Sequence, residues 1–141
     1  MAIETVRISA QGREQLSRLK RYTGVEHWNT LCRWALCVSL TEPTHPPEIK
    51  QKGEAAIEMS WKTFGGAYAE IYWALLEDRC RRDGMTPNPE RLAEQFSLHL
   101  HRGLGYLAAN RRLRSVSDLI SLALKETDRI SDASSSAVVQ L

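Results

Sequence analysis

The chain has 141 residues, 43% of them hydrophobic, and a net charge of +2, which fits a single domain with its own core. It contains no run of about 18 apolar residues and so predicts no membrane span. Its first residues lack the apolar run of a signal peptide, so we expect a cytoplasmic protein. The three cysteines form no CxxC pair, which argues against a disulfide framework and against a zinc site.

The N-terminal residues predict a strand followed by a helix. Residues 3–8 are rich in β-branched side chains, and strand alternation turns Val6 and Ile8 toward the core. Ser9 suits the N-cap of the next helix, and Gly24 suits the position just after its C-terminus. The strand residues expected to face outward are Thr5, Arg7 and Ser9.

A second helix is predicted from about Glu26 to Leu40. Its main apolar stripe consists of Trp28, Leu31, Cys32, Ala35 and Leu36. Further apolar side chains lie on other sides of the same helix, so it needs burial on more than one face. We expect it at the centre of the domain or in a subunit interface.

The remaining elements are mostly helical. Three prolines make residues 41–53 a loop, and residues 55–62 alternate like a strand, although a helix is also possible there. Helices are expected over about 67–82 and from Asn88-Pro89 onward, followed by a short helix capped by Ser117. The predicted fold is mainly α, one helical domain over residues 1–126, with residues 127–141 as a disordered tail.

The basic residues are concentrated in two stretches. Residues 1–24 carry five cations against two acids, and residues 95–117 carry four arginines and no acid. Either stretch has the charge to meet phosphate, or is simply a solvated helix face; the sequence leaves both open. The arginines of the second stretch are Arg102, Arg111, Arg112 and Arg114.

No catalytic constellation is recognisable. His99 and His101 are two residues apart, so on a helix they diverge and cannot share a metal ion. Lys62 to Gly66 has the reverse order of a phosphate-binding loop, which leaves anion binding or close backbone packing for the Gly-Gly pair. Cys80 lies among arginines that favour a thiolate, but a core cysteine is the alternative. We expect no catalysis, no metal and no cofactor.

Residues 5–40 have the order strand, helix, Thr-Gly turn, helix, which is the layout of a ribbon-helix-helix half. The chain from Val6 to about Gly84 resembles the DndE family of DNA phosphorothioation, that is, DNA sulfur modification. The segments that carry the resemblance are Arg7-Ile-Ser9, Leu16-Ser-Arg-Leu-Lys20 with Thr23-Gly24, Trp28-Asn-Thr-Leu-Cys-Arg-Trp-Ala-Leu36, and Ile57-Glu-Met-Ser-Trp-Lys-Thr-Phe-Gly-Gly66 leading into Tyr72-Trp-Ala-Leu-Leu76.

The resemblance implies a helical homotetramer that binds DNA, with a preference for nicked duplex, and that acts with the DndC and DndD proteins. It implies no catalytic centre. We therefore predict a non-enzymatic DNA-binding subunit; the alternatives are a scaffold that holds the other modification subunits, and an enzyme with Cys80 as sulfur carrier. The predicted DNA-binding residues are Arg7, Arg13, Arg18, Lys20, Arg21, Lys50, Lys52 and Lys62.

Overall fold

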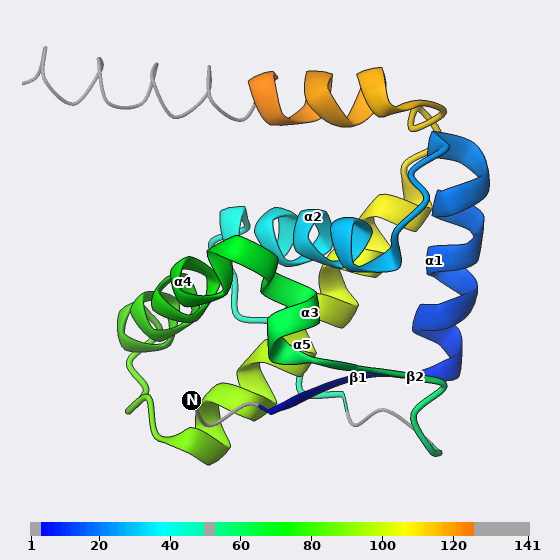
Figure 1. Cartoon of the computed structure of the whole chain (residues 1–141). Helices are drawn as coiled ribbons and strands as arrows, with labels where there is room; N and C mark the ends of the chain where they lie inside the picture. The colour runs from blue at the N-terminus through cyan, green and yellow to red at the C-terminus, as the bar shows by residue number, and fades with distance from the viewer. Residues whose placement is uncertain (1–3, 50–52, 126–141) are drawn as a thin grey trace, which may run out of the picture.

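The computed structural model describes residues 4–49 and 53–125. Lys50, Lys52 and the proposed tail at 127–141 lie outside the described residues. The elements, shown in Figure 1, are β1 (Thr5–Ile8), α1 (Ala10–Thr23), α2 (Trp28–Thr41), β2 (Ile57–Ser60), α3 (Trp61–Gly65), the 3-10 turn η1 (Gly66–Tyr68), α4 (Ala69–Arg82) and α5 (Pro89–Ala109). Residues 116–125 are also helical. The mainly α prediction with two short strands is confirmed.

The predicted signals at both ends of α1 are confirmed. The Ser9 hydroxyl accepts a hydrogen bond from the Gly12 backbone N–H at 3.1 Å, and Gly24 has φ 75°, the left-handed conformation that glycine adopts without strain. Val6 and Ile8 are buried as expected. Ser9, expected to face outward, is buried instead, because its backbone N–H meets the His101 ring.

The strands pair within the chain. β1 and β2 form a two-stranded antiparallel sheet in which Arg7 is opposite Glu58. The analogy with a ribbon-helix-helix half therefore holds for the order of the elements, but β1 pairs with β2 rather than across a dimer axis. The alternating pattern over 55–62 is a strand only as far as Ser60, whose hydroxyl accepts from the Thr63 N–H and starts α3.

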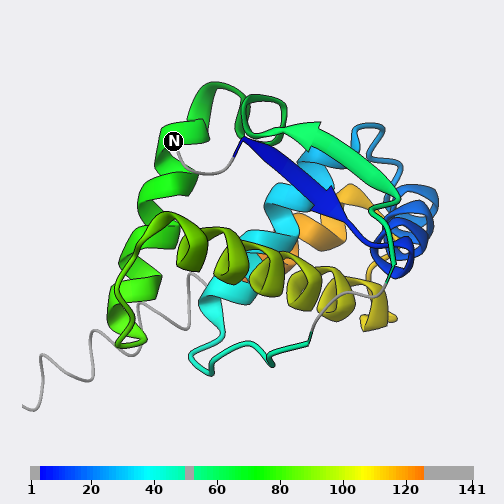
Figure 2. The ribbon, with the colours of Figure 1, turned by 90° about the horizontal axis from the view of Figure 1, so that it is seen from below.

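The core is built around the crossing of α2 and α5, which lie against each other in Figure 2. The buried side of α2 includes Leu31, Ala35 and Leu36, and α1 and α3 cover further parts of it. The apolar circumference of α2 is thus satisfied largely inside the monomer. Leu100 and Leu104 of α5 are fully buried against this core.

α4 has one buried side and one side with exposed apolar residues. Leu76, Arg79 and Cys80 point inward and are buried. Ile71 and Leu75 of α4 are exposed instead, as is Tyr68 at the end of η1. The last helix, at 116–125, begins earlier than predicted. Its N-cap is Ser115 rather than Ser117, with the Ser115 hydroxyl accepting from the Asp118 N–H.

Among the described residues, no helix combines the length and the apolar content needed to cross a bilayer.

Candidate nucleic-acid interface

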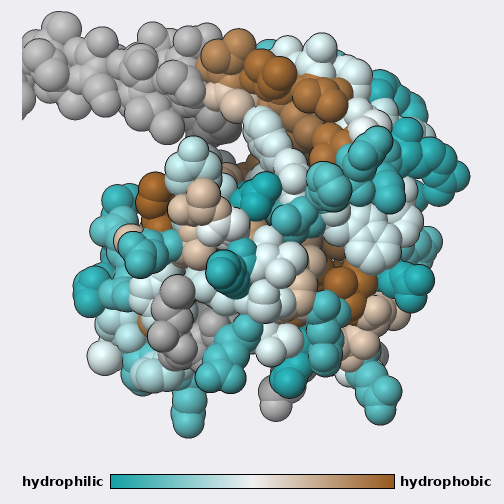
Figure 3. Space-filling model, in the orientation of Figure 1, coloured by the Kyte–Doolittle hydropathy of each residue, from teal (hydrophilic) through white to brown (hydrophobic). Residues whose placement is uncertain are grey.

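The outer face of α1 is a row of cations. Leu16 and Leu19 are buried, so the helical period turns the charged residues of α1 to solvent. Figure 3 shows hydrophilic side chains covering the α1 side of the molecule, at the right of the view. The predicted site residues exposed on this face are Arg13, Arg18, Lys20 and Arg21. Lys20 and Arg21 occupy the last turn, where cations are favourable near the helix C-terminus.

The other predicted site residues lie apart from α1. Arg7 is exposed on β1 and pairs across the sheet with Glu58, with Nε 3.4 Å from Oε1. Lys62 is exposed on α3, which begins beside the start of β1, where the Trp61 N–H donates to the Glu4 carbonyl. α1 begins at the opposite end of β1, so Lys62 and the α1 cations are separated by the length of the strand (Figure 1).

Arg102 belongs to the second basic stretch of the sequence, but its side chain is hydrogen-bonded to other parts of the protein. Its guanidinium donates to the Ser39 hydroxyl and carbonyl, both at 2.8 Å, and to the Thr44 carbonyl at 2.9 Å. Arg79 binds the Leu40 carbonyl at 2.9 Å and Asp83 at 3.0 Å in the same region. Both arginines donate to carbonyls at and beyond the C-terminal end of α2, where a helix leaves carbonyls without their usual partners four residues on. Sequence composition gives no sign of this role.

The structure brings the rest of the second basic stretch to α1. A hollow of about 570 Å³ lies between the C-terminal half of α1 and the segment after α5. The Arg114 guanidinium carbon lies 4.8 Å from the centre of the Tyr22 ring, a cation–π contact between the two segments. The residues that line the hollow are Arg18, Tyr22, Ala108, Ala109, Asn110, Arg111, Leu113 and Arg114.

The cations around this hollow have no acidic partner among the described residues. The exposed ion pairs of the protein involve other residues, such as Arg81 with Glu77 and Arg82 with Asp78 on α4. In the sequence, Arg18 and the stretch from Arg111 to Arg114 belong to separate clusters. Their proximity depends on how α1 packs on α5, for which the sequence carries no local signal.

The buried cysteines and histidines lie in surroundings typical of residues that stabilise the fold. Burial raises the pKa of the Cys32 thiol to about 12 and raises that of Cys80 as well, so both favour the protonated thiol over a reactive thiolate. His99 meets the Ser39 hydroxyl at 2.8 Å, whereas His101 accepts from the Ser9 N–H at 3.2 Å. No group of three or more metal-ligating side chains occurs within residues 4–49 and 53–125.

The Gly-Gly pair after α3 is a packing feature. A side chain at Gly65 would bring its Cβ within 2.7 Å of the Ala69 Cβ. Gly66 has φ 57°, which again suits glycine. The crowding at Gly65 and the positive φ at Gly66 are steric and conformational reasons for the two glycines.

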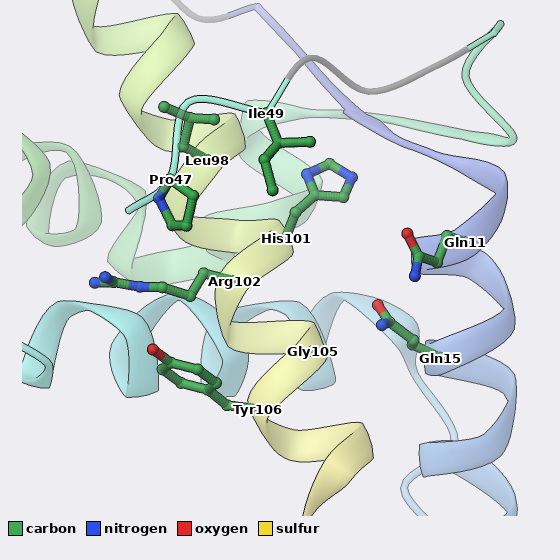
Figure 4. A pocket seen from close by; sticks show the side chains of 9 residues that line it. All are labelled: Gln11, Gln15, Pro47, Ile49, Leu98, His101, Arg102, Gly105 and Tyr106. Atoms are coloured by element: carbon green, nitrogen blue, oxygen red, sulfur yellow. The ribbon is translucent and has the colours of Figure 1, made fainter. Parts of the chain in front are cut away.

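A second hollow lies between α1, α5 and the segment around Pro47 (Figure 4). The figure shows Gln11 and Gln15 on α1 facing it from one side, while Arg102 and Tyr106 project from α5. Arg102 is held by the carbonyls described above and lies 5.8 Å from the Tyr106 ring centre. This hollow therefore offers amides and apolar surface but no free cation among the described residues that line it.

A family model identifies the family of the chain, and a solved structure shares its fold. The family model "DNA sulphur modification protein DndE" matches residues 5–115. The fold is similar to the crystal structure of DndE from Escherichia coli B7A involved in DNA phosphorothioation modification, with a TM-score of 0.63 at 21% sequence identity, over 76% of this chain and 98% of that chain. No curated protein sequence matches the chain. Because the family model spans most of the sequence, the chain belongs to the DndE family of DNA sulphur modification proteins.

Proposed function

We propose that this protein is a non-enzymatic, cytoplasmic DNA-binding subunit of the phosphorothioation machinery, which holds duplex DNA by its phosphate backbone. The observation that carries the proposal is the basic surface formed by the outer face of α1 and the loop after α5. On this surface Arg18, Arg111 and Arg114 converge without acidic partners among the described residues. Cations that are not already neutralised can release counterions from DNA, which is the main source of sequence-independent affinity.

The other cations add to this surface to different degrees. Arg13, Lys20 and Arg21 extend it along α1. Arg7 contributes less because Glu58 partly neutralises it. Lys62 reaches a phosphate only if the DNA also passes the α3 end of the sheet, and we include Lys50 and Lys52 on their charge alone.

A nicked duplex is the preferred form in this proposal. The basic surface is spread over α1 and one loop, so several phosphates must approach it together. Smooth bending of intact duplex costs on the order of 1–6 kcal/mol, and a nick lowers that cost because one strand is already broken.

Assembly into a homotetramer that works with DndC and DndD completes the proposal. An oligomer repeats the basic surface and so multiplies the number of phosphates bound by one particle. The exposed apolar side chains of Ile71 and Leu75 on α4, with Tyr68 of η1 beside them in the sequence, supply a contact face. The same face favours the second candidate function, a scaffold that holds the other modification subunits.

A binding titration separates the two functions. We expect the isolated protein to bind a fluorescent nicked duplex more tightly than intact duplex or single-stranded DNA of the same sequence. The double variant R18A/R21A should weaken binding to all three. The matched control R81A/R82A removes the same charge from exposed arginines that are paired on α4, and should bind like wild type. If the folded wild-type protein binds none of the three DNAs, the scaffold function is favoured.

A further inference from the structure

The hollow beside α1 has a composition that a general DNA-binding surface does not need. Its charged lining residues are Arg18 from α1 and Arg111 and Arg114 from the loop, and no acidic residue is among the described residues that line it. The phosphates of a DNA duplex are spaced along its backbone, so a surface that binds duplex needs cations spaced in the same way. Here three arginines from two segments line one concave site.

The loop that carries two of these arginines is held in place. The Asn110 side chain accepts from the Arg112 N–H at 3.0 Å, and the Leu113 N–H donates to the Asn110 carbonyl at 3.2 Å. Leu113 is buried, and the Arg114 N–H donates to Asp118 at 2.7 Å. Because the backbone is already ordered, binding an anion here loses little conformational entropy.

Tyr22 has a positioning role in this site. Its ring lies under the Arg114 guanidinium at 4.8 Å, which directs that group toward α1. Tyr22 is 43% exposed and lines the hollow. Ala108, Ala109 and Leu113 give the hollow an apolar part beside its charged part.

We propose that this hollow binds a nucleotide phosphate monoester, with the phosphate among Arg18, Arg111 and Arg114 and the attached sugar and base against the apolar part. A terminal phosphate carries close to two negative charges at neutral pH, whereas a phosphodiester carries one, so three cations favour the monoester. Arginine suits it further because its planar fork donates two parallel hydrogen bonds to phosphate oxygens.

Two sources carry this chemistry: the phosphorylated end of a DNA strand at a nick, and a free nucleotide. Binding of a strand end rests on the proposed DNA-binding function. In that case the hollow would hold the phosphorylated end of the broken strand at a nick, and not an internal phosphate of the duplex. A free nucleotide would occupy the same arginines without DNA. The experiment distinguishes the two.

The test compares nicked duplexes of one sequence that carry a 5′-phosphate, a 3′-phosphate or only hydroxyls at the nick, by fluorescence anisotropy. We expect one phosphorylated nick to bind about tenfold more tightly than the hydroxyl nick, as charge-assisted hydrogen bonds of this kind provide. Deoxyadenosine 5′-monophosphate and inorganic phosphate are titrated separately by calorimetry. Tight binding of the mononucleotide with no discrimination among nicks supports the hollow with the free nucleotide as source.

The variants use neighbouring arginines of the same loop. R111A should abolish the preference for the phosphorylated nick, so that the ratio of the affinities for the phosphorylated and hydroxyl nicks falls from about ten to about one. This ratio is the readout, because Arg111 also belongs to the basic surface and its loss weakens binding to every nick. R112A is the control: Arg112 is also exposed but lines a different hollow, with Asp118 and Lys125, so the preference should persist. Y22F should keep the preference and Y22L should reduce it, because only the first retains a ring under Arg114.

Equal affinity of folded wild-type protein for all three nicks, together with no calorimetric signal from the mononucleotide, overturns this inference. If all nicks bind equally and R18A/R21A weakens them equally, the DNA-binding function stands while the phosphate site does not. If no DNA binds but the mononucleotide binds in an R111A-sensitive manner, the site stands and the DNA-binding function does not.

Discussion

Gly103 of α5 packs directly on the backbone of Ala35 in α2. A Cβ atom built at Gly103 would lie 1.7 Å from the Ala35 carbonyl oxygen, far closer than two such atoms can approach. The two central helices can come this close only because position 103 has no side chain. Gly103 lies at the α2–α5 crossing, on which the α1 surface and the loop after α5 depend for their relative placement.

We therefore expect G103A to destabilise the fold by about 2–3 kcal/mol or more, because the helices must separate to admit the methyl group. G105A is a matched control in the same helix: the nearest atom to its Cβ is Gln15 Nε2 at 3.9 Å. Alanine has the higher helix propensity, so G105A should be neutral or stabilising by up to about 1 kcal/mol. Chemical denaturation measures both, and equal effects would contradict the close packing at Gly103.

The sequence predicted local structure better than tertiary partners. Ser9 and Gly24 mark the ends of α1 in the sequence itself, because capping depends on neighbouring residues only. The sequence does not predict the partner of β1. β2 begins about 50 residues later, and nothing in the residues of two short strands specifies that they pair. The exposure of Ile71 and Leu75 on α4 also has no signal in the sequence, because spacing shows that apolar residues share a face but not whether another element covers that face.

The same limit applies to the candidate site. Composition gave the cations of α1 and of the stretch near Arg111, and the helical period correctly put the α1 cations outside. It could not show that Arg102 turns inward to the carbonyls around Ser39 while Arg111 and Arg114 approach Arg18. The number of cations in a sequence therefore does not show how many are free to bind phosphate, because that depends on the partners each cation has in the fold.

His99 makes stability depend on pH. Its ring is buried against the Ser39 hydroxyl, and burial with the nearby Arg79 and Arg102 charges lowers its pKa from 6.5 to about 4. As pH falls below 6.5 the unfolded chain binds a proton that the folded chain does not, so stability is lost across the window from 6.5 to about 4. Between pH 7 and pH 5 this amounts to about 2 kcal/mol.

The measurement is the melting temperature of wild type and H99Q between pH 7 and pH 5. Glutamine does not titrate and retains an amide able to bond Ser39, so the pH dependence should become shallower in the variant. It should not vanish, because burial also lowers the pKa of His101. Identical pH dependence in the two proteins would show that His99 titrates normally in the folded state.

The outer face of α4 tests the proposed assembly. Ile71 and Leu75 are 56% and 43% exposed, so I71E/L75E should leave the monomer fold intact. If they form the subunit interface, light scattering should give a tetramer for wild type and a smaller species for the variant, because burying carboxylates in an interface is costly. I120E, on the exposed side of the helix at 116–125, is the control and should remain tetrameric. A wild-type monomer at micromolar concentration would refute the assembly.

Binding through the phosphate backbone predicts a steep dependence on salt. For duplex DNA the logarithm of the association constant should fall by about 0.9 per neutralised phosphate for each unit of log salt. R18A/K20A/R21A removes cations from the exposed face of α1 and leaves its buried leucines in place, so the protein should stay folded. We expect its salt slope to be shallower by about 0.9 for each phosphate that the variant no longer neutralises.

The reduction in affinity should also be similar for duplexes of different sequence, because phosphates are the same at every step while base edges are not. R81A/R82A again serves as the control, since these arginines are paired on α4. An unchanged slope in the folded α1 variant would mean that α1 does not face the DNA. The DNA would then have to bind Arg111, Arg112 and Arg114 without α1, and R111A/R112A/R114A should produce the shallower slope instead.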